Sequence, residues 1–201
     1  TGAQEQLIRS VCATGKPVVV VLVAGKPFAI PYIKEKVPAI LAQWYAGEQA
    51  GNSIADILFG KVNPSGKLPF SFPQSTGHLP AYYNYLPTDK GYYKEPGTYT
   101  SPGRDYVFSS PAPLWTFGHG LSYTRFEYVQ ATTDKTSYQP HDTIRISVKV
   151  KNSGKLAGKE VVQIYIHDVV STVMTPVKQL KGFKKIELQP LSLLHISEPT
   201  R

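Results

Sequence analysis

The sequence contains a single cysteine among its 201 residues, Cys12. No disulfide can therefore form within the chain, and a metal site built on cysteine ligands is excluded. Cys12 lies among apolar residues at helical spacing, which is typical of a small buried side chain rather than of a reactive thiol. We expect no metal site in this chain.

Long hydrophobic runs are also absent. The longest apolar stretch, Pro17–Gly25, is too short to cross a bilayer, so we expect no membrane span. The net charge is +8, but the basic residues are scattered or alternate along an expected strand, as Lys149 and Lys151 do. A nucleic-acid-binding surface gathers its basic residues on one face, so we expect no nucleic-acid partner.

One glycine- and lysine-containing stretch, GKVNPSGKLPFSF at 60–72, has some features of a phosphate-binding loop. Such a loop has four residues between its glycines and a Ser or Thr after its lysine. Here Gly60 and Gly66 enclose five residues, and a leucine follows Lys67. We therefore predict a chain-reversing turn at 63–66, no nucleotide site and no cofactor.

The first 72 residues have the pattern of an α/β layer. Apolar residues at helical spacing alternate with short β-branched runs, of which PVVVVLVAG is typical of a strand buried on both faces. This order favours parallel pairing of the strands. We expect helices at 3–12, 31–36 and 47–60 and strands at 17–25 and 38–44.

Residues 73–124 form a Pro-, Gly- and Tyr-rich segment that we interpret as a linker loop. Seven of the thirteen tyrosines lie between Tyr82 and Tyr106. Long loops of this kind are usually functional or linking. Tyrosine rings and polar side chains in such a loop can contact a ligand, so we single out candidate substrate-binding residues, and the alternative is a linker that clamps two domains. The candidates are Tyr83, Asn84, Tyr85, Arg104 and Asp105.

From about residue 125 to 190 the apolar residues recur with a period of two. TIRISVKVK, EVVQIYIHD and LKGFKKIEL each alternate apolar and polar side chains, which predicts strands of an antiparallel β-sandwich. The last eleven residues, 191–201, are similar at all but one position to an in-frame translation of a transposase adapter used in sequencing libraries. We interpret this tail as an artefact that leaves the sandwich incomplete, with unpaired strand edges.

Several stretches together carry a resemblance to a known family. PVVVVLVAGKPF, WYAGEQAGNSIADILFGKVNPSGKLPFSFP and LWTFGHGLSYTRFEY resemble the C-terminal part of the α/β sandwich domain of glycoside hydrolase family 3. GKEVVQIYIHDVVSTVMTPVKQLKGFKKIEL is similar to the fibronectin type III-like domain that ends many of these enzymes. The implied fold is a partial α/β sandwich with a largely parallel sheet at 1–72, the linker at 73–124, and an incomplete all-β fibronectin type III-like sandwich at 125–190.

The resemblance implies retaining hydrolysis, which needs two carboxyl groups about 5–5.5 Å apart. In the family the nucleophile is an Asp in a Ser-Asp-Trp motif of an N-terminal barrel, and no Asp precedes a Trp here. The acid/base Glu belongs to a loop before the helix that matches residues 3–12. We therefore expect no catalytic residue in this chain. Glu48 is interpreted as structural, and His119, between two glycines, as part of a backbone bend.

These expectations make the chain the accessory C-terminal part of a retaining β-glycosidase, inactive on its own. The resemblance is strongest to bacterial β-glucosidases, and it implies β-linked glucosides or oligosaccharides as substrates of the complete enzyme. The implied partner is the barrel domain in the same polypeptide, in a periplasmic or extracellular setting. The alternative is a non-catalytic carbohydrate-binding or adhesion module built on the sandwich and the Tyr-rich segment.

Overall fold

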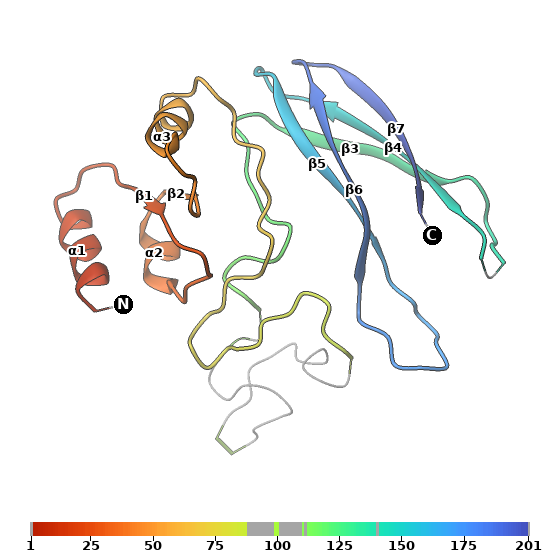
Figure 1. Ribbon diagram of the computed structural model, residues 1–201, viewed down its shortest axis with the longest axis horizontal. Helices are drawn as coiled ribbons and strands as arrows, with labels where there is room; N and C mark the ends of the chain where they lie inside the picture. The colour runs from red at the N-terminus through yellow and green to blue at the C-terminus, as the bar shows by residue number, and fades with distance from the viewer. Residues whose placement is uncertain (1, 88–98, 101–109, 111, 140, 201) are drawn as a thin grey trace. The chain divides into compact units, whose positions relative to one another are not determined.

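The computed structural model divides the chain into two compact units, shown with their elements in Figure 1. We call them the α/β unit and the sandwich unit and describe each by itself. The structure describes residues 2–87, 99–100, 110, 112–139 and 141–200. Among these residues, the α/β unit contains 2–56, 70–83 and the described part of 92–117, and the sandwich unit contains 57–69, 84–87 and the described part of 118–200.

The α/β unit has the element order expected from the sequence. Its elements are α1 (Ala3–Cys12), β1 (Val19–Leu22), α2 (Pro31–Lys36) and β2 (Ala39–Ala42), and α3 (Ala50–Leu58) continues into the sandwich unit. The two strands pair in parallel, with Val19 opposite Ala39. Pro31 occupies the start of α2, where its missing N–H leaves no bond unmade. No helix among the described residues is long and apolar enough to cross a bilayer.

The core of the α/β unit is small. Val20, Ile33 and Val37 are buried, and Cys12 packs against them as a half-buried small side chain. The expectation that the first strand is buried on both faces is wrong, because Val19 remains 47% exposed. Among the described residues this sheet has two strands of four residues each, which cover too little area to bury both faces.

The sandwich unit consists of two antiparallel sheets that face each other across one core. One sheet has the order β3-β4-β7 and the other pairs β5 with β6. The strands are β3 (Phe126–Thr133), β4 (Ile144–Asn152), β5 (Gly158–Ile166), β6 (Gln179–Leu188) and β7 (Leu193–Thr200). The period-two pattern thus predicts three of these strands correctly, β4, β5 and β6. Side chains from both sheets fill the core, namely Val148, Val150, Val162, Ile186, Leu188 and Ile196.

The tail residues, which we expected to lie outside the natural fold, form β7 in the structure. β7 pairs antiparallel with β4 over its whole length, and Ile196 is buried opposite Val148. An unpaired strand edge is a template for any extended segment, and LLHI supplies an apolar residue for the core. The edge of β4 is therefore paired rather than exposed, while the origin of the tail stays a prediction.

The predicted turn at residues 63–66 is wrong, because no turn is formed there. The side chain of Asn63 supplies the bonds instead: its Oδ1 accepts from Ser122 Oγ and from Tyr123 N, both at 2.9 Å. Its Nδ2 donates to the carbonyl of Ala157 at 3.0 Å. One asparagine thereby fixes two other segments of the sandwich unit, a role that turn propensity alone does not indicate.

Asn152 at the end of β4 is completely buried, with 0% of its surface exposed. Its Nδ2 donates to the carbonyls of Leu156 at 2.8 Å and Leu188 at 3.1 Å. Its Oδ1 accepts from Thr124 Oγ1 at 2.7 Å and from Gly154 N at 3.0 Å. Because every donor and acceptor of the amide is used, the burial of this polar group is compensated.

Candidate functional site

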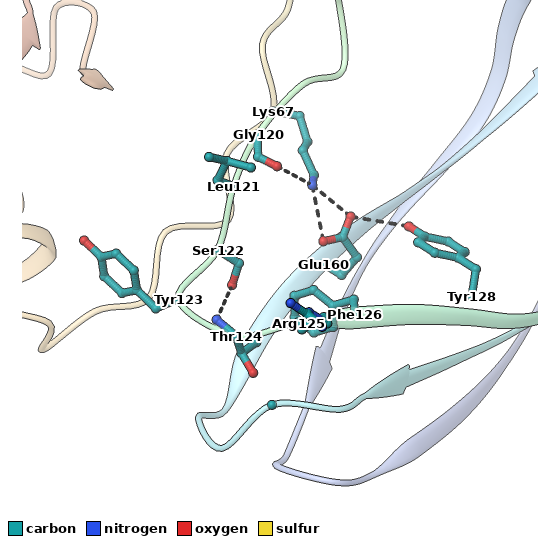
Figure 2. Close-up of a pocket in the computed structure, with 11 residues that line it drawn as sticks. Lys67, Gly120, Leu121, Ser122, Tyr123, Thr124, Arg125, Phe126, Tyr128 and Glu160 are labelled. Atoms are coloured by element: carbon teal, nitrogen blue, oxygen red, sulfur yellow. Dashed lines mark hydrogen bonds and ion pairs between the residues drawn. The ribbon is translucent and has the colours of Figure 1, made fainter. Parts of the chain in front are cut away.

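A pocket of ≈590 Å³ lies within the sandwich unit, beside the start of β3 and β5 (Figure 2). Three parts of the chain form it: the irregular segment before Pro69, the stretch that leads into β3, and the first residues of β5. Figure 2 draws the residues that line it, which are Lys67, Gly120, Leu121, Ser122, Tyr123, Thr124, Arg125, Phe126, Tyr128, Gly154 and Glu160.

A buried ion pair between Lys67 and Glu160 lies at the centre of this pocket. The Lys67 ammonium is 2.9 Å from Oε1 and 3.2 Å from Oε2 of the carboxylate, and it also donates to the carbonyl of Gly120 at 3.3 Å. Only 18% of the Lys67 side chain and 9% of the Glu160 side chain are exposed. Since a charge at this depth is costly without a partner, the two side chains depend on each other.

Tyr128 completes the network from β3. Its hydroxyl donates to Glu160 Oε1 at 3.4 Å, as the dashed line in Figure 2 marks. Partial burial, and after it the charge of the nearby Glu160 carboxylate and the hydrogen bond to it, together raise the pKa of the Tyr128 phenol to about 12. These effects disfavour a second negative charge beside Glu160, so the phenol remains a hydrogen-bond donor at neutral pH.

Two glycines allow the stretch before β3 to lie against its neighbours. A Cβ added to Gly120 would lie 2.3 Å from the backbone oxygen of Gly66, and Gly118 has φ +79°, which disfavours other residues. Leu68 N donates to the carbonyl of His119, and Gly118 N to the carbonyl of Leu68, both at 2.8 Å. The bend expected around His119 therefore pairs with the backbone of Leu68 in a short ladder of two hydrogen bonds. This ladder places Lys67, the residue before Leu68, beside Glu160.

The chemistry available in this pocket is structural rather than hydrolytic. Glu160 is the only carboxylate among the lining residues, and both its oxygens contact Lys67 or Tyr128. A retaining glycosidase needs two carboxyl groups about 5–5.5 Å apart. The ring of Tyr123 points away from Glu160 in Figure 2, and its hydroxyl donates to the carbonyl of Ile57 at 2.9 Å.

The residues predicted to contact substrate lie elsewhere. The ring of Tyr83 stacks on Phe117 in the α/β unit, with centroids 4.2 Å apart and planes 15° from parallel. In the sandwich unit Asn84 is exposed, and the carbonyl of Tyr85 accepts a hydrogen bond from Val177 N at 3.0 Å. The other two candidates, Arg104 and Asp105, lie outside the described residues.

Sequence reasoning missed Glu160, although a signal for it was present. In β5 the inward row consists of alternate residues, and it includes Val162 and Ile164. Glu160 belongs to the same row, so the alternation places a carboxylate among apolar side chains. A charged residue in such a row needs a counter-charge. The lysine that we had considered only as a failed phosphate ligand, Lys67, provides it.

The two units define a class of protein in which an α/β layer is followed along the chain by a five-stranded antiparallel sandwich. Residues 1–123 match the family model described as glycosyl hydrolase family 3 C-terminal domain. Residues 160–192 match the model of the fibronectin type III-like domain. The chain belongs to glycoside hydrolase family 3, and the matched region is the C-terminal part of such enzymes rather than their catalytic barrel.

The relatives are similar over almost the whole chain. A periplasmic β-glucosidase of Salmonella typhimurium is 46% identical over 98% of this chain, and a β-xylosidase of Formosa agariphila is 43% identical over 94%. The solved structure of a β-glucosidase from Erythrobacter marinus has a TM-score of 0.90 and 41% identity over 99% of this chain. In each case the chain spans about a quarter of the relative's length, 26%, 25% and 25% in the same order.

Removing the charge of Glu160 is expected to destabilise the sandwich unit strongly. Glu160→Gln leaves the poorly exposed Lys67 ammonium without its counter-charge, so we expect a loss of about 3 kcal/mol in the free energy of unfolding. Replacing both partners, Lys67→Met with Glu160→Leu, should recover most of that loss. Urea unfolding followed by far-ultraviolet circular dichroism measures both.

The matched control for this substitution begins on the same strand, β5, and reaches the paired strand β6. Lys159 and Glu187 form an exposed pair at 3.5 Å, with 52% and 58% of their side chains exposed. Glu187→Gln should therefore change the free energy of unfolding by less than about 1 kcal/mol. Equal effects of Glu160→Gln and Glu187→Gln would contradict a structural role for the buried pair.

The raised pKa of Tyr128 predicts a loss of stability in alkali. The phenol has an ordinary pKa of 10.0 in the unfolded chain and about 12 in the fold. The protonated Tyr128 phenol therefore contributes to the free energy of unfolding, and this contribution is fully present below pH 10.0. It disappears as the pH rises towards 12. Tyr128→Phe should remove that part of the pH dependence and one late-titrating group from the tyrosinate absorbance. An unchanged titration curve in this variant would refute the assignment.

Proposed function

We propose that this chain is the C-terminal accessory part of a retaining β-glucosidase, which hydrolyses O-glycosyl bonds of β-linked glucosides or oligosaccharides. The observation that carries this proposal is the extent of the similarity to relatives named β-glucosidase, 46% identity over 198 residues in the Salmonella protein. A Listeria innocua relative, solved in complex with glucose, has a TM-score of 0.81 over 98% of this chain. Neither similarity depends on one short motif.

The geometry of the described residues supports an accessory rather than a catalytic role. Glu160 is held by Lys67, and Glu48 is exposed in the turn that precedes α3. Both oxygens of Glu160 are engaged by Lys67 and Tyr128, and the position of Glu48 just before α3 is one where a carboxylate favours the helix N-terminus. In this proposal both catalytic carboxylates come from the rest of a longer polypeptide, and this chain contributes a folded support.

The Tyr-rich segment is the part of this chain that we propose to contact substrate. Asn84 is exposed, so its amide is accessible to a sugar hydroxyl, and the neighbouring ring of Tyr82 is 68% exposed. Tyr83 and Tyr85 are held by the ring stack and the backbone bond described above. Arg104 and Asp105 belong to the same proposal on sequence grounds alone.

We further propose that the complete enzyme works in the periplasm or outside the cell. The support comes from the Salmonella relative, which is named as periplasmic. The single cysteine agrees with this setting, since a chain that forms no internal disulfide folds equally well in reducing and oxidising compartments.

A chimera tests the proposed function. The segment of the Salmonella relative that matches this chain is replaced by the 201 residues, and turnover of an aryl β-glucoside is measured. We expect turnover by the chimera and none by the 201-residue chain alone, because only the chimera has both carboxylates. The relative without its matching segment serves as the control and should be inactive or much weaker.

Two outcomes would count against the proposal. One is turnover by the isolated chain that disappears on Glu48→Gln or Glu160→Gln. The other is a folded but inactive chimera while the isolated chain binds a β-glucan, which would favour the carbohydrate-binding module.

Loss of the Asn84 amide should weaken substrate binding in the active chimera. Asn84→Ala removes one hydrogen bond to a sugar hydroxyl, so we expect KM to rise about fivefold with little change in kcat. Asn52→Ala is the control, because Asn52 lies on α3 and its amide bonds Gln49 on the same helix turn. Equal KM values in the two variants would remove Asn84 from the proposed substrate contacts.

A further inference from the structure

The loop that joins β5 to β6, residues 167–178, exposes an unusual amount of apolar surface. Val169 is 83% exposed, Val170 88% and Val173 69%. Between Asp168 and Lys178 the sequence VVSTVMTPV contains no charged residue. Such an uncharged, β-branched stretch favours association in water unless something covers it.

One backbone hydrogen bond ties the C-terminal end of the 167–178 loop to the rest of the sandwich unit, and a second hydrogen bond lies within the loop. Val177 N donates to the carbonyl of Tyr85 at 3.0 Å, and Val173 N lies 3.4 Å from Ser171 Oγ. Figure 1 shows the loop extending beyond the paired part of β5 and β6. Valine side chains have few rotamers, so the apolar surface is largely preformed and loses little entropy on docking.

The loop between β3 and β4 shows what a solvent-facing loop of the same unit looks like. Its Asp134 accepts a hydrogen bond from Tyr138 Oη at 2.7 Å, and Lys135 pairs with Asp142 at 3.2 Å. None of its described residues belongs to the large, exposed apolar side chains of the protein. The β3–β4 loop thus lacks the exposed apolar surface that the 167–178 loop carries.

We infer that the 167–178 loop is a docking surface for the catalytic domain of the same polypeptide. This inference rests on the proposed function. The chain spans only about a quarter of its relatives, so most of the complete enzyme is available to cover the loop, at the high effective concentration of a linked domain. An apolar centre with one charge at each side, Asp168 and Lys178, has the composition of an interface core and its rim.

Hydrogen–deuterium exchange on the chimera tests the docking surface. Peptides that cover the 167–178 loop are compared between the chimera and the isolated 201-residue chain, and the β3–β4 loop serves as the internal control. We expect exchange in the 167–178 loop to slow at least tenfold in the chimera, while the control loop is unchanged. Equal exchange rates in the two proteins overturn the inference.

A pair of variants adds a second readout. V169D/V170D introduces charge at the centre of the surface, so it should lower the Tm of the chimera and restore fast exchange in the loop. V129D is the matched control, since Val129 on β3 is 57% exposed and lies at the bulge of the other sheet. Equal effects of the two changes on the chimera overturn the inference.

The outcomes separate this inference from the proposed function. An active chimera with an unprotected loop rejects the docking surface alone. An inactive chimera with a protected loop supports the surface and contradicts the function. If exchange in the isolated chain slows with increasing concentration and the chimera gives no further protection, a second copy covers the loop and the inference is wrong.

Discussion

The sandwich unit depends on the need to neutralise one buried carboxylate. Glu160 lies in the inward row of β5, where an isolated charge is too costly, and its partner Lys67 comes from 93 residues earlier in the chain. The segment that carries Lys67 must therefore lie against the sandwich whenever the sandwich is folded. Tyr128 and the Gly120 carbonyl fill the remaining positions around the pair, so the network joins strands of both sheets, β3 and β5, to the irregular segments that carry Lys67 and Gly120.

Hydrogen bonds from polar side chains connect the described irregular segments of the sandwich unit, where no strand pairing is available. Asn63 and Asn152 each connect distant stretches, and between them their side chains bond seven other residues. Asn152 bonds its own turn at Gly154 as well as Thr124 and Leu188. The absence of a side chain at Gly120 lets two backbones meet at a distance that no other residue would allow. Long irregular segments thus become ordered without helices or strands, and residues outside the strands are essential parts of the sandwich unit.

The sequence predicted the regular elements well because periodicity is a local property. The helix at 3–12, the parallel pair of strands and three strands of the sandwich, β4, β5 and β6, follow from the spacing of apolar residues. Three features did not follow. The exposure of Val19 depends on how few strands the sheet has, the bonds of Asn63 depend on residues far away in the chain, and the partner of Glu160 depends on where Lys67 is brought. The motifs that carry the family resemblance describe the family, but they leave these contacts unspecified.

Buried polar groups and exposed apolar groups differ in whether the fold gives them partners. This difference bears on the role that we propose for the chain. The buried polar side chains of Asn152 and Glu160 have partners within their own unit, whereas Val19, Val23, Val169 and Val170 keep large exposed fractions. Polar networks are directional and fix geometry from within, while apolar surface is stabilised by any partner of the right shape. The networks of Asn152 and Glu160 therefore fix the sandwich unit from within, and its exposed valines take no part in them. In the proposed role as a support for a catalytic domain, this division matters, because the polar network settles the fold of the sandwich unit while the exposed valines of the 167–178 loop stay accessible for docking.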